Sequence, residues 1–98
     1  MARIIVTPQA QRDVEAAISA LELPGDTWVR IARSLRVLED FPLAGSQLEG
    51  RWAPTRSVLG PWRWMILLYR FDESSDRVFV VAMHDARSAG SARASQNS

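Results

Sequence analysis

The apolar positions in the first part of the chain change from strand spacing to helical spacing at a proline. The β-branched segment 3–7 predicts a short strand. Thr7 then stands at an N-cap position and Pro8 at the first helical position, a pair that is typical of helix starts. Apolar residues follow at helical spacing, namely Ala10, Val14, Ala17, Ile18 and Leu21. The segment therefore predicts a strand followed by an amphipathic helix.

A second helix is predicted after a break at Leu23–Asp26, in which Asp26 can cap the next helix. Its apolar stripe consists of Trp28, Ile31, Ala32, Leu35 and Leu38. Phe41–Gly45 ends this stripe with a proline and a glycine. Because the break is short, we expect the two helices to form an antiparallel hairpin.

The pattern beyond Gly50 is typical of strands. Thr55–Leu59 predicts a short strand, which Gly60 and Pro61 close. Trp62–Phe71 predicts a longer one, and its alternation gives two faces. One face carries Arg63, Met65, Leu67, Tyr69 and Phe71, and the other carries Trp62, Trp64, Ile66, Leu68 and Arg70. Arg77–His84 is apolar on both faces and predicts a central strand.

The order of these elements predicts an α+β fold, β-α-α-β-β-β, in which the helical hairpin packs on a small curled, mainly antiparallel sheet. Residues 1–87 are expected to form one domain. Residues 88–98 are small, polar and basic, and we expect a disordered tail in solution unless a partner orders it. The apolar stretch before Pro8 is too short for a signal peptide, so we expect cytoplasmic localisation without membrane contact.

Composition excludes several kinds of chemistry. All 12 basic side chains are arginine, so no lysine can form a Schiff base or act as a general base. The chain has no cysteine, which excludes disulfides, thiolate zinc sites and cysteine nucleophiles. Against 11 acids the formal net charge is only +1, which does not suit a protein that binds polyanions through overall charge.

The positive charge is nevertheless concentrated in one segment. Gly50–Phe71 contains no acid and four arginines, which are Arg51, Arg56, Arg63 and Arg70. Trp52, Trp62 and Trp64 lie between them, and guanidinium groups with aromatic rings suit phosphates and stacked bases. The alternative interpretation is that the tryptophans belong to the core and the arginines are solvated.

His84 is the only histidine and is the best candidate for a general acid or base. It could equally be a strand-end residue that hydrogen-bonds to the backbone. One histidine without cysteines or clustered carboxylates does not suit a metal site, so we expect neither a metal nor another cofactor.

Four motifs in order give the chain a resemblance to a known family. They are Thr7-Pro8-x-Ala10-x-x-Asp13-Val14, Leu38-x-x-Phe41-Pro42-x-x-Gly45-x-x-Leu48-x-Gly50, Arg56 followed by Gly60-Pro61-Trp62-Arg63, and His84-x-Ala86-Arg87. Together they resemble the RelE/ParE toxins of bacterial type II toxin–antitoxin pairs, with Trp62 in place of the usual tyrosine.

The resemblance implies a cognate antitoxin as partner and one of two targets. The RelE branch cleaves mRNA on the ribosome without a metal, by attack of the 2′-hydroxyl on the adjacent phosphate. Arg56 and Arg63 would then clamp phosphate, and Arg87 would stabilise charge in the transition state. Arg51, Arg70, Trp62 and Trp64 would extend the RNA contact. The alternatives are a ParE-like inhibitor of DNA gyrase without catalysis, or a non-toxic module that binds RNA or protein.

Departures from the RelE pattern concern the catalytic base. The lysines usual near Arg56 are missing, and Ser88–Ser91 replaces the usual tyrosine or histidine that follows Arg87. His84 is then the expected proton acceptor, with Tyr69 in a supporting role. Arg30, on the second predicted helix, is expected to matter little.

Overall fold

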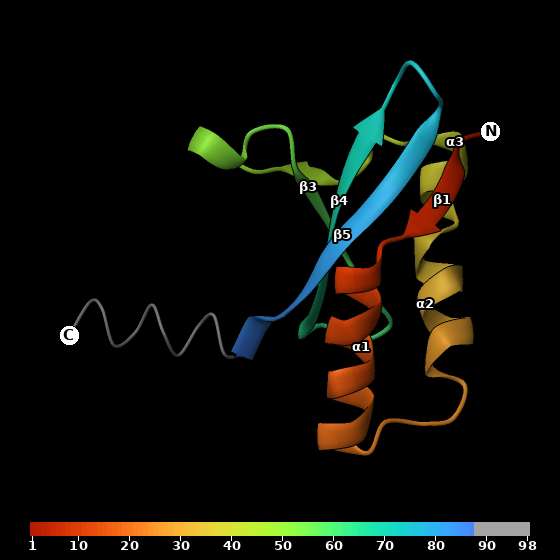
Figure 1. Ribbon diagram of the computed structural model, residues 1–98, viewed down its shortest axis with the longest axis vertical. Coiled ribbons are helices and arrows are strands. Elements are labelled where there is room, and N and C mark those ends of the chain that lie inside the picture. The colour runs from red at the N-terminus through yellow and green to blue at the C-terminus, as the bar shows by residue number, and fades with distance from the viewer. Residues whose placement is uncertain (88–98) are drawn as a thin grey trace.

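The computed structural model describes residues 1–87 as helices packed on a five-stranded open sheet (Figure 1). The elements are β1 (Arg3–Val6), α1 (Pro8–Leu21), α2 (Thr27–Leu35), α3 (Val37–Asp40), β2 (Ser46–Gln47), the 3-10 helix η1 (Gly50–Trp52), β3 (Arg56–Leu59), β4 (Met65–Asp72) and β5 (Arg77–Asp85). The predicted α+β order is confirmed. The tail predicted over 88–98 lies outside the described residues, and no helix within 1–87 is long and apolar enough to cross a membrane.

The sheet has the strand order β1-β5-β4-β3-β2. β1 runs parallel to β5, and every other pair is antiparallel. β5 lies between β1 and β4, so it is an interior strand of the sheet, as its apolar run predicted. β2 was not predicted, since a strand of two residues has no periodicity to detect.

Thr7 joins α1 to the sheet. Its hydroxyl accepts a hydrogen bond from the Ala10 N–H at 3.4 Å, which confirms the N-cap, and donates to the Val80 carbonyl at 2.8 Å. Asp13, also on α1, accepts a hydrogen bond from the Met83 N–H at 3.0 Å. Because the β1 pairing ends at Val80, this carboxylate satisfies a backbone donor of β5 that β1 does not reach.

The helical hairpin differs from prediction in two details. Asp26 occupies the N-cap position of α2, but its side chain makes no capping hydrogen bond and instead accepts from Arg30 Nε at 3.0 Å. The second helix also ends at Leu35, and the apolar stripe continues in the separate single turn of α3. Ile31, Leu35 and Leu38 are buried, so the stripe itself is confirmed.

The long strand is shorter at its start than predicted, and this decides where two tryptophans lie. β4 begins at Met65, because the Met65 N–H donates to the Trp62 carbonyl at 3.0 Å and closes a turn. The Gly60 N–H donates to the Met65 carbonyl at 2.8 Å on the other side of that turn. Pro61 has no N–H to pair in a ladder, which favours a turn here over a strand. Trp62, Arg63 and Trp64 therefore belong to the β3–β4 turn.

The core lies between the helices and one face of the sheet. Met65, Leu67 and Tyr69 of β4 are fully buried, which confirms that face of the predicted alternation. A bulge at Leu68/Tyr69 places Val80 opposite Tyr69 but Ala82 opposite Leu68. The extra residue in β5 reverses the alternation of that strand, so that both Val80 and Met83 lie on the core face.

Candidate functional site

Five of the predicted functional residues lie together where β4 begins and β5 ends. These residues, called the sheet-end cluster below, are Trp62, Arg63, Trp64, His84 and Arg87. The strands bring them together, because Met65 pairs with Asp85 and the Ala86 N–H donates to the Trp64 carbonyl at 2.7 Å. Arg63 lies at the turn with an exposed side chain, flanked by the two half-buried indoles.

The aromatic rings of the sheet-end cluster form a continuous stack with two guanidinium groups. The Trp62 and Trp64 ring centroids are 5.9 Å apart with an interplanar angle of 8°. The Arg87 guanidinium lies over Trp64, 4.7 Å from its centroid. The Arg30 guanidinium from α2 lies over Trp62 at 5.9 Å. Cation–π contacts of this kind favour fixed positions for both arginines relative to the indoles.

Asp85 holds the guanidinium of Arg87 from the side. Arg87 Nε donates to Asp85 Oδ1 at 3.1 Å, and the second guanidinium nitrogen donates to Oδ2 at 3.0 Å. The backbone N–H of Arg87 also donates to Oδ1, at 2.9 Å. The hydrogen bonds that Arg87 donates to Asp85, together with the negative charge of that carboxylate, raise the pKa of Arg87 above its ordinary value. Arg87 is therefore a fully charged group, held between a carboxylate and an indole.

His84 lies on the face of the sheet away from the core. It pairs with Ile66 across β4, while its neighbour Met83 packs against the core. The imidazole is exposed and so is accessible to a ligand at this end of the sheet. The structure places His84 at the same sheet end as Arg63 and Arg87, on the face opposite Met83.

The other predicted arginines lie away from this end of the sheet. Arg56 pairs with Tyr69, which lies four positions along β4 from Met65, roughly 13 Å of strand. The Arg56 guanidinium donates to the Leu43 and Gly45 carbonyls at 3.2 and 3.0 Å. The strand register therefore separates Arg56 from Arg63, so that a phosphate contact of Arg56 would lie at a different place from one of Arg63.

Arg70 and Arg51 make contacts of their own. Arg70 Nε donates to the Thr55 hydroxyl at 3.1 Å. The Arg51 guanidinium lies 5.2 Å from the centroid of the exposed Trp52 ring on η1, which projects from the sheet (Figure 1). The four arginines of the acid-free segment thus do not form one continuous face.

Tyr69 is a core residue, so its predicted support of catalysis is wrong. Its side chain is fully buried, and its hydroxyl accepts the Gly45 N–H at 2.9 Å. Burial raises the pKa of Tyr69, against the opposing effects of the Gly45 hydrogen bond and the nearby Arg56 charge. A buried, protonated phenol whose oxygen already accepts a backbone hydrogen bond cannot accept a proton from a ligand at the sheet end.

Two residues of the site were not found from the sequence. Arg30 lies on α2, far in the chain from Trp62, and no local pattern links the two. The sequence analysis expected Arg30 to matter little, and the structure places its guanidinium over the Trp62 ring. Asp85 is the last residue of β5 and precedes Arg87 by two positions. This spacing was the only feature of the sequence that could have indicated the Asp85–Arg87 ion pair.

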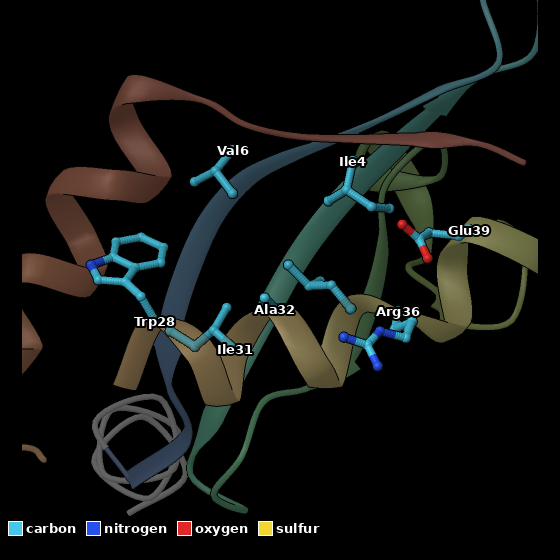
Figure 2. Close-up of a pocket in the computed structure, with 8 residues that line it drawn as sticks. Ile4, Val6, Trp28, Ile31, Ala32, Arg36 and Glu39 are labelled. Atoms are coloured by element: carbon cyan, nitrogen blue, oxygen red, sulfur yellow. The ribbon is translucent and has the colours of Figure 1, made fainter. Parts of the chain in front are cut away.

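A separate apolar groove lies between β1 and α2 (Figure 2). It encloses about 280 Å³ and is lined by Ile4, Val6, Trp28, Ile31, Ala32, Leu35, Arg36 and Glu39. In Figure 2, Ile4 and Val6 extend from β1 toward the side chains of α2, with Arg36 and Glu39 at one end. The groove has an apolar centre and a charged end, which are features of a surface for a protein segment.

The sheet-end cluster has the chemical groups that phosphate and base recognition require. Guanidinium forks donate paired hydrogen bonds to phosphate oxygens, and indoles stack on bases. Within residues 1–87 no group of three or more potential metal-ligating side chains is assembled.

Comparisons with known proteins identify the fold. No protein-family model matches the chain, and no curated protein matches its sequence. Among solved structures, the toxin–antitoxin complex RelBE2 from Mycobacterium tuberculosis has a TM-score of 0.66 at 23% identity, covering 86% of this chain and 96% of that one. The YoeB/ParE toxin from Agrobacterium tumefaciens has a TM-score of 0.65 at 20% identity, covering 85% and 96%. YafQ from E. coli has a TM-score of 0.61 at 15% identity, covering 91% and 98%. The protein therefore has the RelE/ParE-like toxin fold that its sequence motifs resemble.

Proposed function

We propose that this protein is the toxin of a toxin–antitoxin pair and arrests growth by cleaving mRNA on the ribosome. The structural neighbours include a YoeB/ParE toxin and the RelBE2 toxin–antitoxin complex, which supports the first part. The observation that carries the second part is the meeting of Arg63, His84 and Arg87 at one sheet end beside stacked indoles. Inhibition of gyrase requires no such set of phosphate-directed and titratable groups.

The proposed reaction needs only groups that the sheet-end cluster supplies. His84 accepts the proton of an RNA 2′-hydroxyl, whose oxygen forms a bond to the adjacent phosphorus. The bond from phosphorus to the 5′-oxygen breaks, which leaves a 2′,3′-cyclic phosphate, and the departing oxygen takes up a proton from water. Arg63 and Arg87 donate hydrogen bonds to the phosphoryl oxygens, where negative charge increases in the transition state. Trp62 and Trp64 hold an adjacent base by stacking.

Assays with programmed ribosomes and with purified DNA gyrase distinguish the proposed mRNA cleavage from inhibition of gyrase. We expect the protein to cut mRNA on programmed ribosomes and to leave supercoiling by DNA gyrase unchanged. The His84→Ala variant should cleave about 100-fold or more slowly, since general base catalysis contributes 10²–10⁴-fold. Primer extension on the mRNA and a gel assay of plasmid supercoiling give the two measurements. A stalled, cleaved gyrase–DNA complex with intact mRNA would overturn the nuclease and establish the gyrase alternative.

The apolar groove between β1 and α2 is where we propose that the antitoxin binds. We expect the chain to be more stable with this partner than alone, because a ligand that binds only the folded state at 100 times its Kd adds about 2.7 kcal/mol. Thermal unfolding with and without the co-expressed product of an adjacent short reading frame measures this. Ala32→Arg should weaken the complex by obstructing the groove, whereas the neighbouring Arg33→Ala should not. A chain that is monomeric and equally stable alone at high concentration would contradict the prediction.

A further inference from the structure

We propose that Arg30 of α2 is a further phosphate-binding residue of the RNA site, an inference that rests on the proposed function. The Arg30 guanidinium carbon lies over the Trp62 ring, 5.9 Å from its centroid. Trp62 stacks in turn on Trp64, and the Arg87 guanidinium lies over Trp64 at 4.7 Å. The two arginines therefore lie at the two ends of one aromatic stack, which brings a charged group of α2 to the sheet-end cluster.

The hydrogen bonds of Arg30 leave its terminal nitrogens open. The Arg30 Nε donates to both carboxylate oxygens of Asp26 at 3.0 Å. Among residues 1–87, neither terminal nitrogen of Arg30 has a hydrogen-bond partner. These two nitrogens form an edge of paired donors, which matches the oxygens of a phosphate. The Arg30 side chain is 44% exposed, so a ligand can reach this edge from solvent.

Asp26 and the indole beneath the guanidinium restrict the Arg30 side chain before any ligand binds. Arginine loses rotamer freedom when it makes a contact, and a side chain that is already held loses less. The Asp26 carboxylate lies at the Nε edge, so it orients the guanidinium without occupying the terminal edge. Arg87 is held in a similar way, by Asp85 at its Nε and by Trp64. The same kind of arrangement thus occurs at both ends of the stack.

Arg30 contacts a different phosphate from the one that Arg87 contacts. Two indole rings with centroids 5.9 Å apart lie between the two guanidinium groups. A donor must lie within about 3 Å of the oxygen that accepts from it, so one phosphate cannot pair with both arginines. In the proposed reaction Arg63 and Arg87 hold the phosphate that is cleaved. Arg30 therefore holds another phosphate of the same strand, on the α2 side of the stack, and contributes to binding more than to the cleavage step.

The test is single-turnover cleavage of mRNA on programmed ribosomes, with the full chain in excess. The dependence of the rate on protein concentration gives a half-saturating concentration, K½, and a maximal rate. We expect Arg30→Ala to raise K½ about two- to fivefold, as the loss of one exposed charge pair implies, with a smaller change in the maximal rate. The slope of log K½ against log salt concentration should fall by about 0.7, because each phosphate contact on a single strand contributes about this much.

Arg33→Ala is the matched control, because Arg33 is an exposed arginine of the same helix. It removes the same charge and should leave K½ and its salt slope as in the parent protein. Arg30→Lys tests the kind of contact. A lysine binds phosphate as a point charge without the fork, so this variant should recover the salt slope but only part of the affinity. A slope that stays low in Arg30→Lys would show that Arg30 only supports Trp62, and would overturn the phosphate contact.

Arg63→Ala in the same assay separates this inference from the proposed function. Slower cleavage by Arg63→Ala, with Arg30→Ala equal to Arg33→Ala, overturns the role of Arg30 and leaves the nuclease standing. Absence of cleavage by the parent protein overturns both. An unchanged K½ for Arg30→Ala with a weakened antitoxin complex would assign the guanidinium to the antitoxin and likewise overturn the phosphate contact. Circular dichroism and thermal unfolding check that Arg30→Ala and Arg30→Lys fold like the parent protein.

Discussion

Arg63→Ala is expected to abolish growth arrest on expression while the free energy of unfolding stays unchanged. The side chain is exposed at the β3–β4 turn, so its removal leaves no cavity in the core. In the proposed reaction its guanidinium donates to phosphoryl oxygens, and the loss of one such donor typically costs about 10²- to 10³-fold in rate. Cleavage of mRNA on programmed ribosomes measures the rate, and urea unfolding measures the stability.

Arg33→Ala is the control for this experiment, because Arg33 is an exposed arginine of α2. Arg30 would be a poor control, since its guanidinium lies over Trp62 in the stack. Arg33→Ala should arrest growth like the parent protein. If both variants lost toxicity equally, overall charge would be the cause, and the sheet-end cluster would not be the site.

Gly45→Ala is expected to give the largest loss of stability from a single added methyl group. A Cβ at this position would lie 2.6 Å from the Ser57 carbonyl oxygen and 2.7 Å from the Tyr69 hydroxyl. Neither neighbour can move freely, because Ser57 belongs to β3 and Tyr69 is fully buried in the core. Overpacking of this kind costs about 1–3 kcal/mol, and the Tyr69 hydrogen bond to the Gly45 N–H would be strained as well.

Gly25→Ala is the matched control for the effect of glycine itself. A Cβ at Gly25 meets no atom within 4 Å. We expect its free energy of unfolding to change by less than about 1 kcal/mol, in the direction of a small gain from the stiffer unfolded chain. Thermal or urea unfolding of both variants gives the comparison. Equal effects at the two positions would show that the contact of Gly45 with Tyr69 is not close in solution.

The local elements of this protein were determined by its sequence. The N-cap Thr7, the proline after it and the apolar stripes depend on nearest neighbours in the chain, and such local preferences do not need a partner from elsewhere. The interior position of β5 in the sheet was also predicted from the sequence, because a run of apolar residues is typical of such a strand. The ordered motifs then indicated the RelE/ParE-like fold, which the structural neighbours have.

The composition of the site was decided only by the tertiary structure. The acid-free segment suggested one arginine face, but strand register places Arg56 opposite Tyr69 and thus away from Arg63 in the β3–β4 turn. The sequence analysis gave Tyr69 a supporting role in catalysis. The structure buries its side chain in the core, because alternation along β4 directs it inward. Contacts between residues distant in the chain are set by packing and register. The sequence therefore determined which chemical groups this protein has, and the fold decided which of them, such as Arg30, Asp85 and Arg87, lie together.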